Sequence, residues 1–207
     1  MNSLPRLYAI ADASFDDPVR LARDLFVGGA TLVQVRNKTA PARVLLDQVD
    51  RILATAPDGT FVIVNDRADV AWISGAAGVH LGQADLPAPE TRKILGVGSL
   101  IGVSTHNLDQ ALQADQLPVD YLALGPVYPT TSKVNPDPVI GVAGLAEICR
   151  SVRKPVVAIG GITLENAAEV FHAGVHSVAV IRDLLAAPNI SARMRRWIDF
   201  IVGLNLG

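Results

Sequence analysis

The chain has 207 residues, of which 50% are hydrophobic and 18% charged, and its mean hydropathy is +0.33, so it can bury a substantial core. We expect a single domain over residues 1–207. The net charge is −2 and Lys and Arg are scattered, which argues against a nucleic-acid surface or a basic membrane patch. The one cysteine, Cys149, excludes an internal disulfide and is interpreted as buried filler. With no signal-peptide pattern and no run of 18 apolar residues, we expect a cytoplasmic protein that acts on small molecules.

Eight short runs rich in β-branched residues alternate with helical stretches. The predicted strands are residues 6–12, 31–37, 60–66, 78–82, 100–106, 121–127, 155–161 and 177–183. Helical stretches include 17–29, 40–55, 68–76, 107–115, 144–152, 164–174 and 191–204. Strands that alternate with helices predict a parallel sheet, and eight units favour a closed α/β (β/α)8 TIM barrel. The alternative is an open doubly wound sheet, but no G-x-G-x-x-G motif follows the first strand.

The second strand carries "QVRNK" at residues 34–38. Alternation places Val33 and Val35 on the helix side and turns Gln34, Arg36 and Lys38 toward the barrel axis. Burying unpaired cations there is costly, so we expect an anion to meet them. The alternative is an internal network of salt bridges with core carboxylates.

The third strand ends in Asn65 and Asp66, and the turn after the fourth carries Asp85. Active sites of this fold lie at the carboxyl ends of the strands, where these side chains can converge. Two carboxylates beside Arg36 and Lys38 predict a Mg²⁺ ion that also binds a substrate phosphate. The alternatives are a helix N-cap for Asp66 and a turn residue for Asp85.

The fifth strand places Ser104 and His106 near the rim, where their polar groups could instead bond the turn backbone. The sixth runs into about twenty residues rich in Pro and Gly, 125–144, which we interpret as a shaped functional loop rather than a disordered insertion. Its hydroxyls and its lysine suit phosphate oxygens, and they are Thr130, Thr131, Ser132 and Lys133.

The last two strands end in "AIGGI" (158–162) and "VIRDL" (180–184). Paired glycines let backbone N–H groups approach a ligand, and this part of the fold often holds a phosphate. Two anion sites are therefore predicted, with a substrate phosphate in each or two phosphorylated small-molecule substrates side by side.

These motifs together resemble the thiamine-phosphate synthase family, in order and over nearly the whole chain. The quoted segments are "QVRNK", "VNDRADVA", "GVHLGQAD", "GVSTHN", "GPVYPTTSK", "AIGGI" and "VAVIR". The resemblance implies a barrel that couples 4-amino-5-hydroxymethyl-2-methylpyrimidine diphosphate to thiazole phosphate with Mg²⁺. It implies pyrimidine-diphosphate contacts from Gln34, Val35, Arg36, Asn37, Lys38, Asn65, Ser104 and Lys133, and a metal site at Asp66 and Asp85. It implies thiazole-phosphate contacts from Thr130, Thr131, Ser132, Gly161, Ile181 and Arg182.

The implied reaction loses diphosphate first, and the thiazole nitrogen then captures the pyrimidine cation. Such a step needs no enzyme nucleophile, and the sequence offers no Ser-His-Asp or Cys-His arrangement. It needs charge stabilisation on the leaving group, which Mg²⁺ on Asp66 and Asp85 would provide together with Arg36, Lys38 and Lys133. Ser104 is the fourth candidate catalytic side chain. Three positions depart from the family pattern: Asn37 and Ser132 are expected to matter little, and Arg182 could act through its backbone or add a phosphate contact.

Two other functions remain open from the sequence. A thiazole tautomerase of the same barrel family would use a histidine near the end of the fifth strand, and His106 stands there. A non-catalytic regulatory barrel that binds thiazole phosphate is the second. The other histidines, His80, His172 and His176, are interpreted as structural, and the oligomeric state is not predicted.

Overall fold

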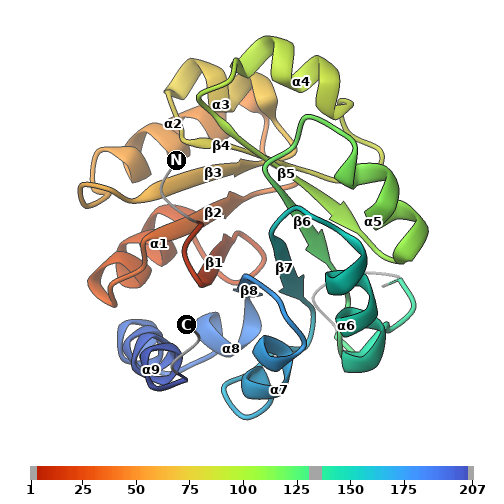
Figure 1. Cartoon of the computed structure of the whole chain (residues 1–207). Coiled ribbons are helices and arrows are strands. Elements are labelled where there is room, and N and C mark those ends of the chain that lie inside the picture. Colours follow the sequence, from red (N-terminus) through yellow and green to blue (C-terminus); the bar gives the residue numbers. More distant parts are fainter. Residues whose placement is uncertain (1–3, 131–136, 205–207) are drawn as a thin grey trace.

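The structure is a computed structural model that describes residues 4–130 and 137–204. Eight parallel strands pair in chain order and close into a barrel, with helices around the outside (Figure 1). The strands are β1 (Leu7–Asp12), β2 (Leu32–Arg36), β3 (Phe61–Asn65), β4 (Gly78–Leu81), β5 (Leu100–Thr105), β6 (Tyr121–Leu124), β7 (Val156–Ile159) and β8 (Ser177–Val180). The predicted (β/α)8 fold is confirmed, and the open-sheet alternative is wrong because β8 pairs with β1, with Val178 opposite Leu7.

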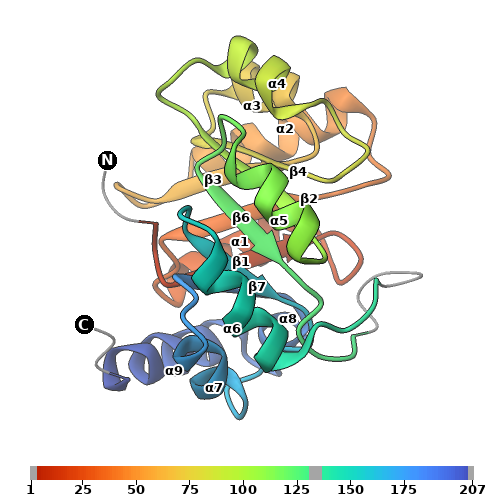
Figure 2. The ribbon, with the colours of Figure 1, turned by 45° about the vertical axis from the view of Figure 1, so that its right-hand side comes forward.

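The helices follow the strands in turn. They are α1 (Pro18–Val27), α2 (Ala42–Leu53), α3 (Ala68–Ser74), α4 (Ala88–Leu95), α5 (Leu108–Asp115), α6 (Gly141–Ser151), α7 (Ala167–His172), α8 (Arg182–Leu185) and α9 (Ile190–Gly203). Side chains of Asp17, Asn107 and Asn189 cap α1, α5 and α9, so the polar residues at these helix starts satisfy free backbone N–H groups. The turned view in Figure 2 again places the helices outside the strands.

Strand alternation divides the core in two. Val33 and Val35 belong to the large cluster between strands and helices, whereas Gln34 points into the barrel interior beside Tyr8. The interior cluster consists of Tyr8, Ile10, Leu32, Ile63, Tyr121, Ala123, Val157 and Ala179. The predicted orientation is confirmed for Gln34 and Arg36, which share the inner face of β2, whereas Lys38 lies beyond the end of the strand with its side chain 55% exposed.

The connection after β6 is shorter than predicted. Helix α6 begins at Gly141, where a φ of +66° suits glycine, so residues 141–144 belong to the helix and the loop covers 125–140. Two helices, α4 and α8, were not among the stretches named from the sequence. Across the part of the chain that the structure describes, no helix has the length and hydropathy needed to span a membrane.

Candidate active site

The carboxyl ends of the strands form one mouth of the barrel, and two of the predicted cations meet carboxylates there. Nη1 of Arg36, at the end of β2, lies 2.5 Å from Oδ2 of Asp12, at the end of β1. Asp12 is only 2% exposed, and its other oxygen accepts a hydrogen bond from the N–H of Ser14. Sequence reasoning missed Asp12, although it is the last residue of its strand, like Asn65.

Lys38 pairs with the next carboxylate along the mouth. Its Nζ lies 3.2 Å from Oδ2 of Asp66. Asp66 in turn is within hydrogen-bond reach of Asp85, so the two predicted metal ligands do converge. The salt-bridge alternative for "QVRNK" therefore describes part of the structure, since both cations have carboxylate partners.

Asp66 adopts an uncommon backbone conformation. Its φ is +62°, and within the described ranges it is the one residue with positive φ that is not a glycine. Asp tolerates this region better than most residues, but the conformation still costs free energy and such residues cluster at functional sites. The proposed N-cap is wrong, because the N-cap of α3 is Arg67 and no side chain caps that helix. The backbone turn instead directs the carboxylate toward Lys38.

Asp85 also holds its own turn. Its Oδ2 accepts a hydrogen bond of 2.6 Å from the N–H of Gly82, so the turn alternative is confirmed alongside the contact with Asp66. Burial raises the pKa of Asp85, the Gly82 N–H opposes that rise, and the neighbouring Asp66 carboxylate adds to it. A carboxylate pair of this kind favours a cation between its members.

Beneath the charged mouth, five polar side chains form a continuous row of hydrogen bonds across the barrel. Gln34 Nε2 donates to the Tyr8 hydroxyl (2.9 Å), which lies 3.0 Å from the Tyr121 hydroxyl. Nδ1 of His80 lies 3.1 Å from the Tyr121 hydroxyl, and its Nε2 lies 2.9 Å from Oγ of Ser104. We call these five residues the interior chain. It joins two predicted binding residues, Gln34 and Ser104, through three that were not predicted to bind.

Packing holds this row in place. The ring of Tyr121 stacks on His80 with centroids 5.7 Å apart and meets Tyr8 edge-on at 5.9 Å. Gly102 leaves room for it, since a Cβ there would lie 2.0 Å from Cζ of Tyr121. Burial lowers the pKa of His80 to about 4, with Lys38 acting in the same direction and Asp85 against it. The imidazole is therefore neutral near pH 7.

The remaining predicted contacts of the pyrimidine diphosphate lie around this mouth. Asn65 is 8% exposed at the end of β3. Val35 is buried on the helix side, and Asn37 Nδ2 donates to Gln48 of α2, as expected for its outward position. Any part that Val35 and Asn37 take in binding would therefore use backbone atoms. Lys133 lies outside the described residues.

The predicted thiazole-phosphate side is built from backbone. Gly160 and Gly161 have φ values of +100° and +66°, and a Cβ on Gly161 would lie 2.7 Å from the carbonyl oxygen of Pro129. The N–H of Tyr128 donates to the Gly160 carbonyl, so the chain after β6 runs directly against the glycines. Thr130 follows Pro129 directly in this segment. Thr131 and Ser132 lie outside the described ranges.

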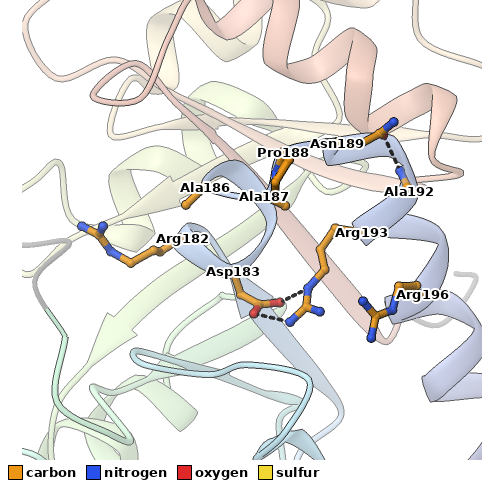
Figure 3. A pocket seen from close by; sticks show the side chains of 9 residues that line it. All are labelled: Arg182, Asp183, Ala186, Ala187, Pro188, Asn189, Ala192, Arg193 and Arg196. Atoms are coloured by element: carbon orange, nitrogen blue, oxygen red, sulfur yellow. Dashed lines mark hydrogen bonds and ion pairs between the residues drawn. The ribbon is translucent and has the colours of Figure 1, made fainter.

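The last two predicted residues, Ile181 and Arg182, start helix α8. The guanidinium of Arg182 lies over the ring of Phe15, with 5.5 Å between its carbon and the ring centroid. It also borders a pocket of about 490 Å³ between α8 and α9 (Figure 3). In Figure 3 Arg182 points away from Arg193 and Arg196, and Arg193 is bound by Asp183. One arginine of this pocket is thus paired and another faces away from it, and we place the site at the barrel mouth.

The contacts of two histidines and the environment of the cysteine can be compared with their predicted roles. Nδ1 of His106 donates to the Gly125 carbonyl (2.6 Å), and its Nε2 lies 3.4 Å from Asp137. His176 bonds the Leu4 carbonyl, which agrees with a structural role. Cys149 is half-buried rather than fully buried as predicted, and its burial raises the pKa of the thiol to about 11.

Within residues 4–130 and 137–204, no group of three or more His, Cys, Asp or Glu side chains is arranged to hold a metal ion. The pair Asp66 and Asp85 still fits Mg²⁺, which commonly takes one or two carboxylates and completes its octahedron with water and substrate phosphate. The donors are oxygens, as this hard cation requires.

Comparisons with known proteins agree on one family. Residues 7–184 match the family described as thiamine monophosphate synthase. Thiamine-phosphate synthase of Koribacter versatilis is 46% identical over 192 residues, covering 89% of this chain and 91% of the relative, and that of Anaeromyxobacter dehalogenans is 45% identical over 190 residues, covering 92% and 85%. The solved thiamine phosphate pyrophosphorylase of Pyrococcus furiosus superposes with a TM-score of 0.88 at 35% identity, covering 97% of this chain and 96% of that one. The chain therefore belongs to the thiamine monophosphate synthase family.

Proposed function

We propose that this protein is a thiamine-phosphate synthase that couples 4-amino-5-hydroxymethyl-2-methylpyrimidine diphosphate to hydroxyethylthiazole phosphate and releases diphosphate. Its family and its relatives, which are transferases, support the coupling reaction. The observation that carries the detailed proposal is the meeting of Lys38, Asp66 and Asp85 at the barrel mouth, beside the Arg36–Asp12 pair.

The charge balance of this mouth supports a divalent cation. Three carboxylates, Asp12, Asp66 and Asp85, stand against the two cations Arg36 and Lys38. A multiply charged diphosphate would be repelled by such a site unless a further positive charge entered. Asp66 and Asp85 would hold Mg²⁺, which supplies charge stabilisation to the diphosphate when bound.

Arg36 and Lys38 can still donate hydrogen bonds to the diphosphate leaving group. Arg36 uses one N–H on Asp12, and a guanidinium carries five, so several can still donate to diphosphate oxygens. The side chain of Lys38 is 55% exposed and bonds Asp66 at its tip, so it can turn between carboxylate and phosphate. Lys133 would add a third cation from the loop after β6.

In the proposed reaction, the bond between the pyrimidine methylene carbon and the diphosphate oxygen breaks first, and its electron pair leaves with the oxygen. The thiazole nitrogen then donates its lone pair to the methylene cation and becomes the charged thiazolium. No proton moves in these two steps, so no side chain has to act as a general base. Arg36, Lys38 and Lys133 would stabilise the developing charge on the leaving group.

The second phosphate would bind where side-chain charge is scarce. Gly161, Ile181 and Arg182 offer backbone N–H groups at the ends of β7 and β8, and Thr130 to Ser132 offer hydroxyls. The close approach of residues 126–129 to Gly160 and Gly161 supports this grouping. The guanidinium of Arg182 rests on Phe15, which favours a backbone role at this position.

The tautomerase alternative has less support. A proton carrier needs a ring nitrogen that can reach the substrate, whereas Nδ1 of His106 is committed to the Gly125 carbonyl and Nε2 lies near Asp137. The charged mouth also has no use in an isomerisation that releases no diphosphate.

A diphosphate-release assay tests the proposal, with each substrate omitted in turn and with a chelator added. Release is expected only when both substrates and Mg²⁺ are present, and Mg²⁺ added back in excess should restore it. Rapid release without thiazole phosphate, or full activity in chelator, would contradict metal-assisted coupling. Conversion of the thiazole alone, without diphosphate release, would support the tautomerase.

A further inference from the structure

The interior chain runs from Gln34 on β2 through Tyr8, Tyr121 and His80 to Ser104 on β5. Tyr8 and Tyr121 are 1% and 0% exposed, and His80 is 8% exposed. Water therefore cannot replace a missing partner in the middle of the chain, and each buried proton needs an acceptor.

The two tyrosine hydroxyls and the His80 ring each carry one proton. Burial raises the pKa of both tyrosines, so each hydroxyl carries one proton, and the His80 ring lies between the Tyr121 and Ser104 hydroxyls, where it accepts at one nitrogen and donates from the other. Each of these three residues can therefore donate one hydrogen bond within the chain and must accept the other.

The first link sets the direction of all the others. Nε2 of Gln34 donates to Tyr8, so the Tyr8 proton has only Tyr121 to receive it. The Tyr121 proton must then go to Nδ1 of His80, which leaves the ring proton on Nε2. That Nε2–H donates to Oγ of Ser104, whose own proton lies beyond the end of the chain. The reverse order is satisfied only if the Gln34 amide is turned over.

We propose that His80 is a positioning residue held as the Nε2–H tautomer, so that the interior chain presents the Ser104 hydroxyl as a hydrogen-bond donor and the Gln34 amide oxygen as an acceptor. His80 has no role in the sequence-based site, where it was interpreted as structural. Its function in this proposal is to fix the direction in which Ser104 bonds, because an imidazole in the other tautomer would turn the hydroxyl proton inward.

This inference rests on the proposed function for its ligand. A 4-aminopyrimidine carries both a ring nitrogen that accepts and an amino group that donates, and the two ends of the chain complement these groups. A ligand ring with the opposite arrangement would leave a buried donor facing a donor, which a hydrogen-bonding site rejects strongly. The direction of the hydrogen bonds along the interior chain would thus determine which pyrimidine ring the site accepts.

Nitrogen NMR of the protein labelled with ¹⁵N-histidine tests the tautomer without any substrate. The chain has four histidines, and the His80 signals are identified by their loss in His80→Gln. At pH 7.5 we expect a directly bonded hydrogen on Nε2 and none on Nδ1. A proton on Nδ1, or an equal mixture of tautomers, overturns the inference.

Tyrosine variants test whether the chain imposes the tautomer. Tyr121→Phe keeps the ring that packs on His80 but removes the donor to Nδ1, so the tautomer preference should weaken to a mixture. Tyr128→Phe is the matched control for the NMR spectrum. It removes a tyrosine hydroxyl that donates to Glu169 and does not belong to the interior chain. If folded Tyr121→Phe still has the Nε2–H tautomer unchanged, the interior chain does not determine the tautomer of His80.

Substitution of His80 separates positioning from structure. A Gln amide can reach the place of Nε2 and donate to Ser104, whereas an Asn amide ends near the place of Nδ1 and cannot. If both variants fold, His80→Asn should raise KM for the pyrimidine diphosphate about ten-fold above that of His80→Gln, with the KM for thiazole phosphate unchanged. Equal KM values would contradict the positioning role. A protein that shows the expected tautomer but releases no diphosphate would contradict the proposed function alone.

Discussion

The two halves of the barrel mouth treat anions differently. At the ends of β1 to β4, side chains of both signs meet in pairs, Asp12 with Arg36 and Lys38 with Asp66, and Asp85 adds a further carboxylate. At the ends of β7 and β8, two glycines with positive φ lie against the loop after β6, and backbone groups dominate. The first arrangement can stabilise charge that increases during a reaction, and the second can hold a phosphate whose charge stays constant.

The largest expected effect comes from breaking the charged half at its carboxylate pair. Asp85→Asn removes one proposed metal ligand, and we expect kcat/KM to fall roughly 10²- to 10³-fold, with partial recovery at high Mg²⁺. The KM for thiazole phosphate should change little, because that substrate belongs to the other half. Steady-state kinetics with each substrate varied measures both values.

Asp109→Asn is the matched control, because Asp109 lies exposed in the first turn of α5. Its kinetics should stay within two-fold of the wild type. An Asp85→Asn enzyme with unchanged kcat and unchanged response to chelator would show that the pair holds no catalytic cation.

The next effect tests the leaving-group role of Lys133. Lys133→Ala should lower kcat roughly 10²-fold while KM for the pyrimidine diphosphate changes far less, because the charge it stabilises grows in the transition state. Lys93→Ala, which removes an exposed lysine on α4, is the control. A raised KM with unchanged kcat would assign Lys133 to ground-state binding instead.

A smaller effect tests the backbone half. Gly161→Ala places a Cβ where the φ is +66° and the Pro129 carbonyl oxygen is 2.7 Å away, so we expect a loss of about 1–3 kcal/mol in unfolding free energy and a raised KM for thiazole phosphate. Urea unfolding and initial rates measure these changes. Gly144→Ala, inside α6, meets only Ile140 Cβ at 3.8 Å and should stabilise the protein by about 0.5–1 kcal/mol. If both substitutions change the unfolding free energy and the KM for thiazole phosphate in the same way, a glycine is not needed at position 161.

The charged half was largely predictable because polar residues at strand ends are a local pattern. Asn65, Asp66 and Asp85 were found in this way, and the alternation of β2 placed Gln34 and Arg36 correctly. Asp12 obeys the same pattern at the end of β1 and was overlooked. Its pairing with Arg36 depends on the register of the first two strands, which places Asp12 opposite Arg36.

The interior chain could not be predicted in the same way. Tyr8, His80 and Tyr121 lie on three strands, and their contacts depend on the stagger of the whole barrel, which no single strand encodes. Local patterns also failed at α4, whose start carries Pro87 and Pro89, and at α8, whose four residues are too few to show a period.

Stability is also expected to depend on pH through His80, which lies beneath the charged half. Burial holds the pKa of His80 at about 4 in the folded protein, against 6.5 for an exposed histidine. Between these values the unfolded chain takes up a proton that the folded protein refuses, so stability falls as pH falls from 6.5 toward 4 and is unaffected by this group at higher pH.

His80→Gln removes that titrating group and leaves the carboxylates in place. In urea unfolding at pH 6.5, 5.5 and 4.5, the wild type should lose up to about 1.4 kcal/mol per pH unit more than the variant, since one proton is linked to unfolding. Parallel losses in the two proteins would mean that His80 is protonated in the folded state. A charged His80 could not accept from Tyr121, and the fixed direction of the interior chain would then hold only at neutral pH.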